Sequence, residues 1–319
     1  MRVSMSPCKP SFVSNESIGY SAMNLASLKP TWGRRDKAVV VLGATGTGKS
    51  RLAIDLATRF PAEVINSDKI QVYKGLNIVT NKVTQEECHG VPHHLLSTVE
   101  PDSDFTASDF CRSASRIADG ITGRGRLPII AGGSNSYVDA LVNDHVDFWS
   151  RYDCCFIWVH VALPVLHSFV SQRVDVMIES GLVNEVRGIF DPNDTDYSKG
   201  LRRAIGVPEM DQFLRCEMSM DQGPFNRVKV LREAVDQIKR NTCDLSCRQL
   251  HKIWHLPVRN LHRLDATDAV LGKDSWERTV AAPAAKIMSK FLDDDHDQYP
   301  PIVFENARFR LAAVAGSTN

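Results

Sequence analysis

Short apolar runs alternate with helical patterns through the first half of the chain. The run Ala38–Leu42 predicts a strand that is buried on both faces of a parallel sheet. A glycine-rich turn follows, and Ser50–Phe60 carries apolar residues at near-helical spacing. Further strands are predicted at Ala62–Ile65, Leu127–Ala131 and Phe156–Leu163. Strands that alternate with helices in this way predict an α/β fold with a doubly wound parallel sheet.

The second half of the chain has a different pattern. Pro164 predicts a helix start, and Gly181 gives that helix a natural stop. Beyond Gly181 we expect no strands, and Phe225–Leu256 predicts one or two long helices. The acidic run Asp293–Asp295, followed by Pro300 and another proline, indicates a solvated turn and a loosely held tail.

These patterns divide the chain into four parts. We expect a leader at residues 1–37, an α/β core at 38–180, a helical lobe that packs on the core at 181–290, and a loosely ordered tail at 291–319. A chain of 319 residues exceeds the size at which one core usually suffices, which agrees with a core carrying an appended lobe.

The leader has the composition of a targeting segment. Residues 1–37 contain seven serines, and Glu16 and Asp36 are their only acidic residues. A serine-rich and acid-poor segment is typical of a plastid transit peptide. The alternative is a disordered leader without an address, which would leave the protein in the cytoplasm.

The composition argues against polyanions and membranes as binding partners. Lys plus Arg equals Asp plus Glu at 38 each, so no overall positive field would draw the protein onto a polyanion. No apolar run approaches the roughly 18 residues that span a bilayer. We therefore expect a soluble, intracellular monomer with no membrane contact and no stable nucleic-acid partner. The 8 cysteines lack framework spacing, which is typical of reduced thiols.

One group of side chains superficially resembles a zinc site. Cys243, Cys247, His251 and His255 recur at every fourth residue. On a single helix the first and last would lie about 18 Å apart, too far for four ligands to meet one ion. The spacing therefore favours a helix face over a metal site.

The turn after the first strand carries a phosphate-binding motif. Gly43–Ser50 matches G-x-x-x-x-G-K-[ST] and lies between a predicted strand and a predicted helix, as this motif requires. Backbone N–H groups at the helix start can surround an anion, Lys49 adds a positive charge, and Ser50 can reach a magnesium ion. The motif alone does not choose between kinases, NTPases and transferases that release diphosphate.

An acidic residue follows the second strand. Asp68 comes directly after the strand that ends near Asn66, and carboxyl ends of parallel strands meet at one edge of the sheet. Asp68 would therefore face the phosphate site, although a helix cap or turn residue is an equally common role for Asp. Neighbouring side chains on a strand face opposite ways, so we interpret His93 and His94 as mainly structural.

Several motifs occur together in a fixed order. The sequence contains GATGTGKS at residues 43–50, NSDKIQVY at 66–73, VPHHL at 91–95 and GGSNSY at 132–137, and continues with RVDVM at 173–177, GLVNE at 181–185, AIGVPE at 204–209 and NTC at 241–243. In this order and spacing the chain resembles the isopentenyltransferase family, which includes tRNA dimethylallyltransferases and the adenylate isopentenyltransferases of cytokinin biosynthesis. The resemblance covers roughly residues 38–256.

The resemblance implies a prenyltransferase that uses dimethylallyl diphosphate as donor and magnesium as metal ion. In such enzymes the phosphate loop holds the donor's diphosphate. Carried over to this chain, Thr45 would hydrogen-bond the bridging oxygen of the leaving group, and Ser50 would contact the magnesium ion. The full set implied to bind diphosphate is Gly43, Thr45, Gly46, Thr47, Gly48, Lys49, Ser50 and Arg173.

The same resemblance implies an acceptor site for adenine. Asp68 would take the N6 hydrogen of adenine, and Ser134 stands where the family usually has threonine. Plant enzymes of this type tend to prefer ADP or ATP over AMP, and Arg227 and Lys229, at the start of the long helix, could meet the outer phosphates. A solvated basic face is the alternative for these two residues.

Two other functions stay open at this point. A tRNA dimethylallyltransferase would share the core motifs, but such enzymes need a large basic surface and eukaryotic ones commonly carry a later zinc finger. The balanced charge of this chain favours a free adenine nucleotide as acceptor. A P-loop small-molecule kinase would instead transfer phosphate from ATP without a prenyl donor.

Overall fold

The computed structural model describes residues 35–219, 224–273 and 275–294. The first 34 residues of the predicted leader and residues 295–319 of the predicted tail lie outside this range. No helix in the described part of the chain is both long enough and apolar enough to cross a bilayer.

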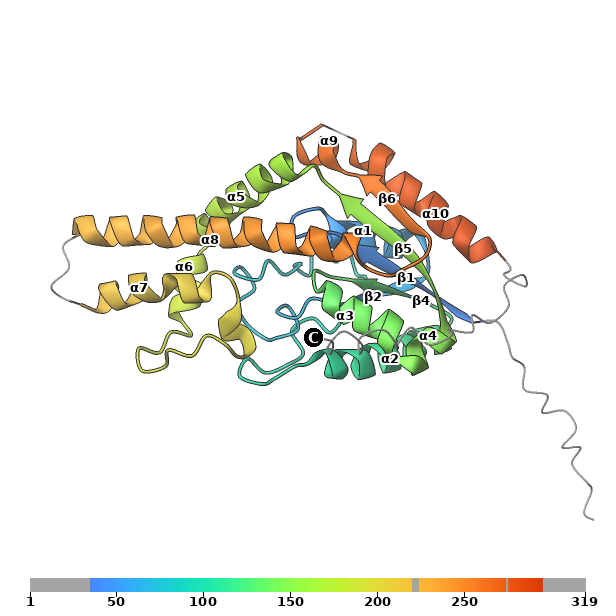
Figure 1. Cartoon of the computed structure of the whole chain (residues 1–319), viewed down its shortest axis with the longest axis horizontal. Coiled ribbons are helices and arrows are strands. Elements are labelled where there is room, and N and C mark those ends of the chain that lie inside the picture. The colour runs from blue at the N-terminus through green and yellow to red at the C-terminus, as the bar shows by residue number, and fades with distance from the viewer. Residues whose placement is uncertain (1–34, 220–223, 274, 295–319) are drawn as a thin grey trace, which may run out of the picture. The chain divides into compact units, whose positions relative to one another are not determined.

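The centre of the fold is a parallel sheet (Figure 1). Its strands lie in the order β3-β2-β4-β1-β5-β6. Every pair of neighbouring strands is parallel, so their carboxyl ends meet at one edge. The predicted fold class is confirmed. The strands are β1 (Asp36–Leu42), β2 (Ala62–Asn66), β3 (His93–His94), β4 (Leu127–Ala131), β5 (Tyr152–His160) and β6 (Leu261–Asp265).

Helices cover both faces of this sheet (Figure 1). Ala38, Val40 and Leu42 of β1 pack toward α2, α3 and α4, whereas Val39 and Val41 pack toward α1, α5 and α10. The helices are α1 (Lys49–Arg59), α2 (Ala107–Gly123), α3 (Asn135–Asp139), α4 (Val146–Arg151), α5 (Leu163–Glu179), α6 (Leu182–Arg187), α7 (Val207–Met218), α8 (Pro224–Trp254), α9 (Thr267–Val270) and α10 (Ala282–Asp293).

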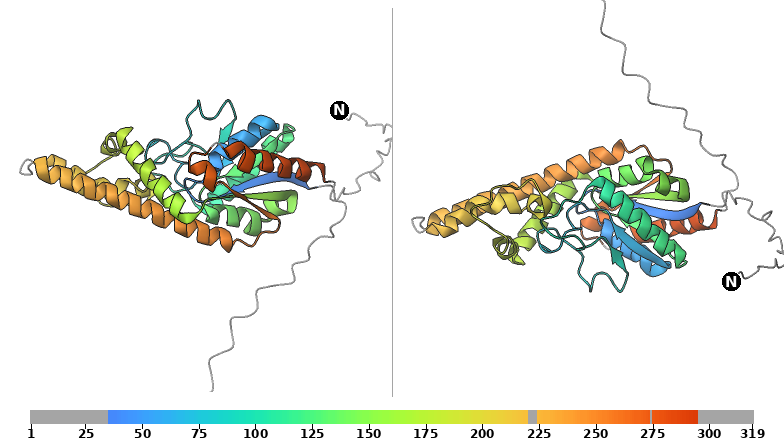
Figure 2. Two further views of the ribbon diagram at one scale, coloured as in Figure 1. Left: turned by 90° about the horizontal axis from the view of Figure 1, so that it is seen from above. Right: turned by 90° about the horizontal axis from the view of Figure 1, so that it is seen from below.

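The long helix of the second half is the single helix α8. Its 31 residues correspond to a length of about 46 Å. One end of α8 extends well beyond the sheet and packs against α7, while the other end lies over the sheet (Figures 1 and 2). The predicted helices of the segment 225–256 are therefore confirmed as one element.

Two details of the strands correct the sequence analysis. β5 ends at His160 and not at Leu163, because Leu163 already begins α5, with Pro164 in its first turn as predicted. The expectation of no strand beyond Gly181 was wrong, since β6 pairs with β5 at the sheet edge. β6 is mostly solvent-exposed, so it lacks the apolar run that marks a buried strand.

The last described helix returns to the sheet. α10 packs on the face that carries α1, and its buried Met288 joins that core. Its helical residues extend to Asp293, three residues into the segment expected to be loosely ordered. The division into a core at 38–180 and a lobe at 181–290 stays a prediction.

Candidate active site

The phosphate loop connects β1 to α1, as the sequence predicted. Gly46 and Gly48 adopt the left-handed backbone region at φ 82° and 93°, and Gly48 is the residue before the first turn of α1. A Cβ atom on Gly48 would lie 2.6 Å from the ring of Trp276, and one on Gly46 would lie 2.7 Å from Val170. Both glycines are therefore needed for the loop to close around the helix start, where N–H groups can bind an anion.

The buried side chain of Lys49 reaches back to the start of the phosphate loop. Its Nζ donates a hydrogen bond to the carbonyl oxygen of Ala44 over 2.7 Å. Burial lowers the pKa of Lys49 to about 8, an effect that nearby Asp68 partly opposes and Arg173 reinforces. A buried ammonium whose charged form is disfavoured in this way would be stabilised by a bound anion.

Thr45 is held by two helices that are distant from it in the sequence. Its hydroxyl accepts a hydrogen bond from the guanidinium of Arg173 on α5 over 2.9 Å, and its backbone N–H donates to Gln249 Oε1 on α8 over 2.7 Å. Burial lowers the pKa of Arg173 to about 10. Its Nε has no hydrogen-bond partner among the described residues, and no carboxylate in that part of the chain pairs with it. An unpaired cation beside the phosphate loop favours a bound anion.

Asp68 follows β2 at the same edge of the sheet. One carboxylate oxygen, Oδ1, accepts hydrogen bonds from the backbone N–H groups of Ile70 at 2.9 Å and Gln71 at 3.3 Å. The other oxygen, Oδ2, faces the turn after β4, because a Cβ atom on Gly133 would lie 3.0 Å from it. The backbone thus orients one oxygen and leaves the other for a ligand.

The paired glycines after β4 allow the Asp68 loop to approach. A Cβ atom on Gly132 would lie 2.5 Å from the backbone nitrogen of Asp68. The next residue, Ser134, is buried, and its hydroxyl accepts a hydrogen bond from the backbone N–H of Lys69 over 2.9 Å. Ser134 therefore holds the Asp68 loop in place, and its predicted contact with the acceptor stays a prediction.

Gln249 is a site residue that the sequence analysis missed. Besides its bond to Thr45, its Nε2 donates to the carbonyl oxygen of Gly133 over 2.8 Å, and its own carbonyl accepts from Asn135 Nδ2 over 3.0 Å. The sequence does carry a signal for Gln249, because the buried face of α8 carries polar residues at helical spacing. The buried positions on this part of α8 are Thr242, Ser246, Gln249 and Ile253.

The structure does not bring Arg227 and Lys229 to this edge. Arg227 lies 22 positions before Gln249 on α8, or about 33 Å along the helix. Its guanidinium donates to the carbonyl oxygen of Ser219, and Lys229 pairs with Glu233 at 3.9 Å. The predicted contact of these two residues with the acceptor stays a prediction, because a helical pattern does not reveal which turns of α8 lie over the sheet.

Lys69, next to Asp68 in the chain, lies within electrostatic range of three other cations, and we call Lys69, Arg203, Arg248 and Lys252 the basic group. Burial is the main cause that lowers the pKa of Lys69, and the charge of Arg203 is the next. Asp68 raises this pKa, whereas Lys252 and Arg248 lower it further. Arg248 and Lys252 are exposed and one turn apart on α8. No member of the basic group forms an ion pair with a carboxylate of the described chain.

Ser50 is the phosphate-loop hydroxyl that could hold a metal ion together with phosphate oxygens. Ser50 lies in the first turn of α1 and lines a cavity of about 10 Å³ with Asn66, Gln71 and His93. His93 Nδ1 is bonded to the carbonyl of Val91, while its Nε2 has no partner in the described chain. Burial lowers the pKa of His93, so it is a neutral acceptor for a water molecule. Hydroxyl, amide and water oxygens suit Mg²⁺, which retains several waters in most protein sites.

The cysteine and histidine run on α8 has other contacts. Cys247 Sγ lies 3.4 Å from His167 Nε2, and the rings of His251 and His255 stack on each other at 4.2 Å. No set of three or more His, Cys, Asp or Glu side chains placed to hold a metal ion is found in the described part of the chain.

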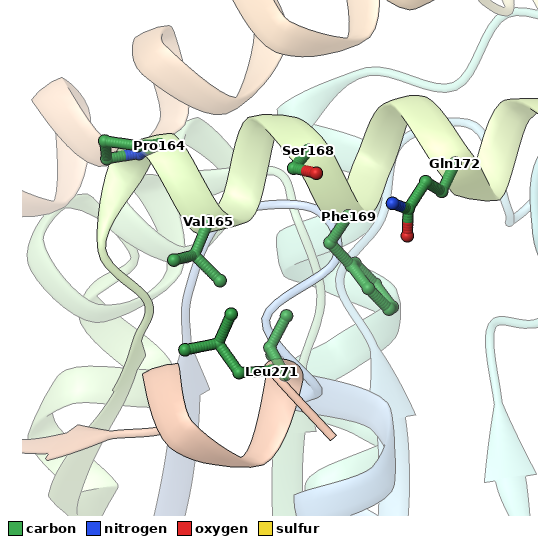
Figure 3. Close-up of a pocket in the computed structure, with 7 residues that line it drawn as sticks. Pro164, Val165, Ser168, Phe169, Gln172 and Leu271 are labelled. Atoms are coloured by element: carbon green, nitrogen blue, oxygen red, sulfur yellow. The ribbon is translucent and has the colours of Figure 1, made fainter. Parts of the chain in front are cut away.

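An apolar cavity of about 420 Å³ lies between α5 and α9 (Figure 3). Phe169 separates it from the phosphate loop, because its ring would be 3.3 Å from a Cβ atom on Gly46. The lining contains no charged side chain, so this cavity is not a diphosphate site. Its lining residues are Pro164, Val165, Ser168, Phe169, Gln172, Val270 and Leu271.

Two carboxylates from the motifs at residues 181–185 and 204–209 stabilise the segments around the site without lying in it. Glu185 accepts hydrogen bonds from the backbone N–H groups of Ile78 and Val79, which anchors the segment after Asp68 to α6. Glu209 accepts from the backbone N–H of Gly206 at 2.7 Å and from Asn241 at 2.6 Å. These motifs therefore connect α6, α7 and α8 to the loops that carry the site.

Fold and site together define a P-loop protein that binds a phosphorylated substrate next to a carboxylate. The family model for IPP transferase matches residues 71–151 and 144–254, which is more than half of the chain. The chain belongs to the IPP transferase family, and the resemblance found in its motifs is confirmed.

Curated relatives agree with this assignment, and a solved structure shares the fold. The chain is 60% identical to adenylate isopentenyltransferase 5, chloroplastic, of Arabidopsis thaliana over 84% of each protein. It is 43% identical to the adenylate isopentenyltransferase of Humulus lupulus over 80% of this chain and 90% of the relative. Its fold matches tRNA delta(2)-isopentenylpyrophosphate transferase from Staphylococcus epidermidis with a TM-score of 0.65 at 23% identity, covering 81% of this chain and 99% of the other.

Proposed function

We propose that the protein transfers a dimethylallyl group from dimethylallyl diphosphate to the N6 amine of an adenine nucleotide and releases diphosphate. This reaction is the first step of cytokinin biosynthesis. The observation that carries the proposal is the bond from Arg173 to Thr45, which places an unpaired cation on the phosphate loop at the sheet edge that also holds Asp68. The names of the plant relatives, adenylate isopentenyltransferases, support the same chemistry.

The donor side stabilises a leaving diphosphate. Because Thr45 Oγ1 accepts a hydrogen bond from Arg173, its own O–H remains available to donate to the oxygen that separates from the prenyl carbon. Lys49 and Arg173 contribute positive charge where negative charge grows as the carbon–oxygen bond breaks. The chain residues thus favour the separated charges of the transition state over the intact donor.

The acceptor amine is a weak nucleophile, and the acceptor side of the site needs to compensate for this. The lone pair of the N6 amine is delocalised into the adenine ring, so the amine needs to be oriented and to lose a proton as the new bond forms. Asp68 Oδ2, which accepts no hydrogen bond from the described residues, is the group that would orient the amine and take that proton. Oδ1, held by two backbone N–H groups, keeps the carboxylate in place.

The basic group supports a phosphorylated acceptor. Lys69 directly follows Asp68 and lies within electrostatic range of Arg203, Arg248 and Lys252. None of the four pairs with a carboxylate in the described chain, so their charge is available to the phosphates of a nucleotide. Four cations suit an acceptor with more than one phosphate, and we propose ADP or ATP. The overall charge of zero argues against an extended surface for tRNA.

Transferases of this family generally use a divalent metal ion. We propose magnesium, held by Ser50 and by the donor's diphosphate, with His93 accepting a hydrogen bond from a water beside it. The ion would supply positive charge to the departing diphosphate.

We also propose a plastid location. The serine-rich, acid-poor composition of residues 1–37 supports it, as do relatives named chloroplastic, although one relative at 51% identity is named mitochondrial. A fusion of residues 1–37 to a fluorescent protein should enter plastids. Mitochondrial or diffuse cytosolic fluorescence would contradict this location.

The acceptor assignment is tested by competition in one reaction. AMP, ADP, ATP and a tRNA anticodon stem-loop are mixed at equal concentration with radiolabelled dimethylallyl diphosphate and magnesium. We expect label in ADP and ATP ahead of AMP. Label that appears mainly in the stem-loop would make the protein a tRNA dimethylallyltransferase.

A further inference from the structure

The side chain of Gln249 joins the two halves of the site. Its Oε1 accepts from the backbone N–H of Thr45 at 2.7 Å on the donor side, and its Nε2 donates to the carbonyl of Gly133 at 2.8 Å on the acceptor side. Gln249 is 7% exposed, and Asn135 donates a hydrogen bond to its backbone carbonyl. The side-chain amide of Gln249 therefore connects the loop after β1 to the loop after β4, although α8 follows neither strand directly.

The same amide lies next to the predicted base. A Cβ atom on Gly133 would be 2.7 Å from Gln249 Nε2 and 3.0 Å from Asp68 Oδ2, so both atoms lie within 3.0 Å of one point. The distance between Thr45 and Asp68 consequently depends on a short chain of contacts through Gln249 and Gly133. Leaving group and proton acceptor are the two groups whose separation the reaction needs to fix.

We propose that Gln249 is a positioning residue that aligns the reacting carbon of the donor with the acceptor amine. This inference rests on the proposed function, and it assigns Gln249 no direct part in bond breaking. By holding Thr45 at a set distance from the Gly133 turn, the amide fixes the donor cradle relative to Asp68. An error of about 1 Å in such an alignment can lower a rate by about 100-fold.

A misaligned acceptor has a specific chemical consequence. If the carbon–oxygen bond of the donor breaks while the amine is out of line, a water oxygen bonds to the prenyl carbon and loses a proton. The products are then dimethylallyl alcohol and diphosphate, with the nucleotide unchanged. The ratio of alcohol to prenylated nucleotide thus reports alignment, and a purely structural role for Gln249 would not change it.

The test variant is Gln249→Leu, which keeps most of the side-chain volume and removes both hydrogen bonds. Its matched control is Gln237→Leu on the same helix, where the glutamine bonds, among the residues that the structure describes, only to Asn241 and Arg240 of α8. Each purified variant is incubated with dimethylallyl diphosphate, magnesium and ATP, and diphosphate, alcohol and prenylated nucleotide are quantified. Thermal unfolding of each variant gives the folded fraction.

For Gln249→Leu we expect kcat for nucleotide prenylation to fall by about 10- to 100-fold while KM for the donor changes by less than about 3-fold. The alcohol should become a larger share of the diphosphate released. Gln249→Asn, which keeps the amide but is one methylene too short to reach both loops, should show the same shift. Gln237→Leu should behave as the wild type.

A Gln249→Leu protein with an unchanged product ratio, and with activity lost only in proportion to its folded fraction, would overturn the positioning role. A raised KM for the donor at unchanged kcat would also overturn it, since Gln249 would then only bind substrate. If the wild type itself forms no prenylated nucleotide, the proposed function fails and this inference fails with it. A wild type that prenylates ATP, beside a Gln249→Leu variant with an unchanged product ratio, overturns this inference alone.

Discussion

The guanidinium of Arg173 on α5 donates a hydrogen bond to the hydroxyl of Thr45 over 2.9 Å. The two residues are 128 positions apart in the sequence, and their contact determines which way the threonine hydroxyl can donate. With one lone pair engaged by a cation, the O–H is both free and more acidic, which suits a donor to a departing phosphate oxygen.

Loss of that hydroxyl should slow the chemical step. Thr45→Val removes the O–H at nearly constant volume and leaves Arg173 without its acceptor, so kcat should fall by about 10- to 1000-fold. Thr45→Ser keeps the hydroxyl and is the matched control, with an expected loss of less than about 5-fold. Steady-state rates of prenylated nucleotide formation measure both. Equal activity of the valine and serine variants would remove the hydroxyl from the mechanism.

The charge of Lys49 should make donor capture dependent on pH. Its pKa in the free protein is lowered to about 8, chiefly by burial, so its positive charge is present below pH about 8 and is lost as the pH rises through that value. We expect kcat/KM for dimethylallyl diphosphate to decline above pH about 8. In the donor complex the diphosphate raises the pKa of Lys49, so kcat should stay level over the same range.

A pH series of initial rates from pH 6.5 to 9.5 separates these two parameters. A profile of kcat/KM that is flat to pH 9.5 would contradict the assignment of Lys49 as the titrating cation at the donor site.

Asp68 should be dispensable for folding and donor binding but not for transfer. In Asp68→Asn the side-chain oxygen can still accept from Ile70 and Gln71, while the capacity to take a proton is lost. We expect prenyl transfer to fall by about 100- to 10,000-fold. Calorimetry with inorganic diphosphate and magnesium should give a Kd within about 3-fold of the wild type. Turnover at the wild-type rate would exclude Asp68 as the base.

The basic group should determine affinity for the acceptor's phosphates. Lys252→Ala and Arg248→Ala should each raise KM for ATP by about 10-fold and raise KM for adenosine little, because only the nucleotide presents phosphates to these cations. Arg227→Ala and Lys229→Ala, at the distant end of α8, are the controls and should leave KM for ATP unchanged. The reverse outcome would place the acceptor phosphates at the start of the helix after all.

The parts of the site that could be predicted from the sequence are the residues that directly follow a strand, because the end of that strand determines where they lie. The phosphate loop and Asp68 each come directly after a buried strand, and parallel pairing brings both to the same edge. The paired glycines after β4 follow the same rule. No knowledge of distant contacts is needed for any of them.

Gln249, Arg248 and Lys252 could not be placed in this way. Their position depends on which turns of a 31-residue helix lie over the sheet, and helical spacing is the same along its whole length. Arg227 and Lys229 were chosen for their charge at the helix start, whereas the opposite end of α8 reaches the loop. β6 was missed because an exposed edge strand with His262, Arg263 and Asp265 carries no apolar run.

The central claim is that the phosphate loop holds a prenyl donor and makes its carbon electrophilic toward an adenine amine. The most direct test is mass spectrometry of the products after incubation of the purified protein with dimethylallyl diphosphate, magnesium and ATP. We predict a nucleotide that carries one dimethylallyl group on N6, formed together with one diphosphate. The absence of any prenylated adenylate, or phosphate transfer from ATP when the prenyl donor is left out, would contradict the account.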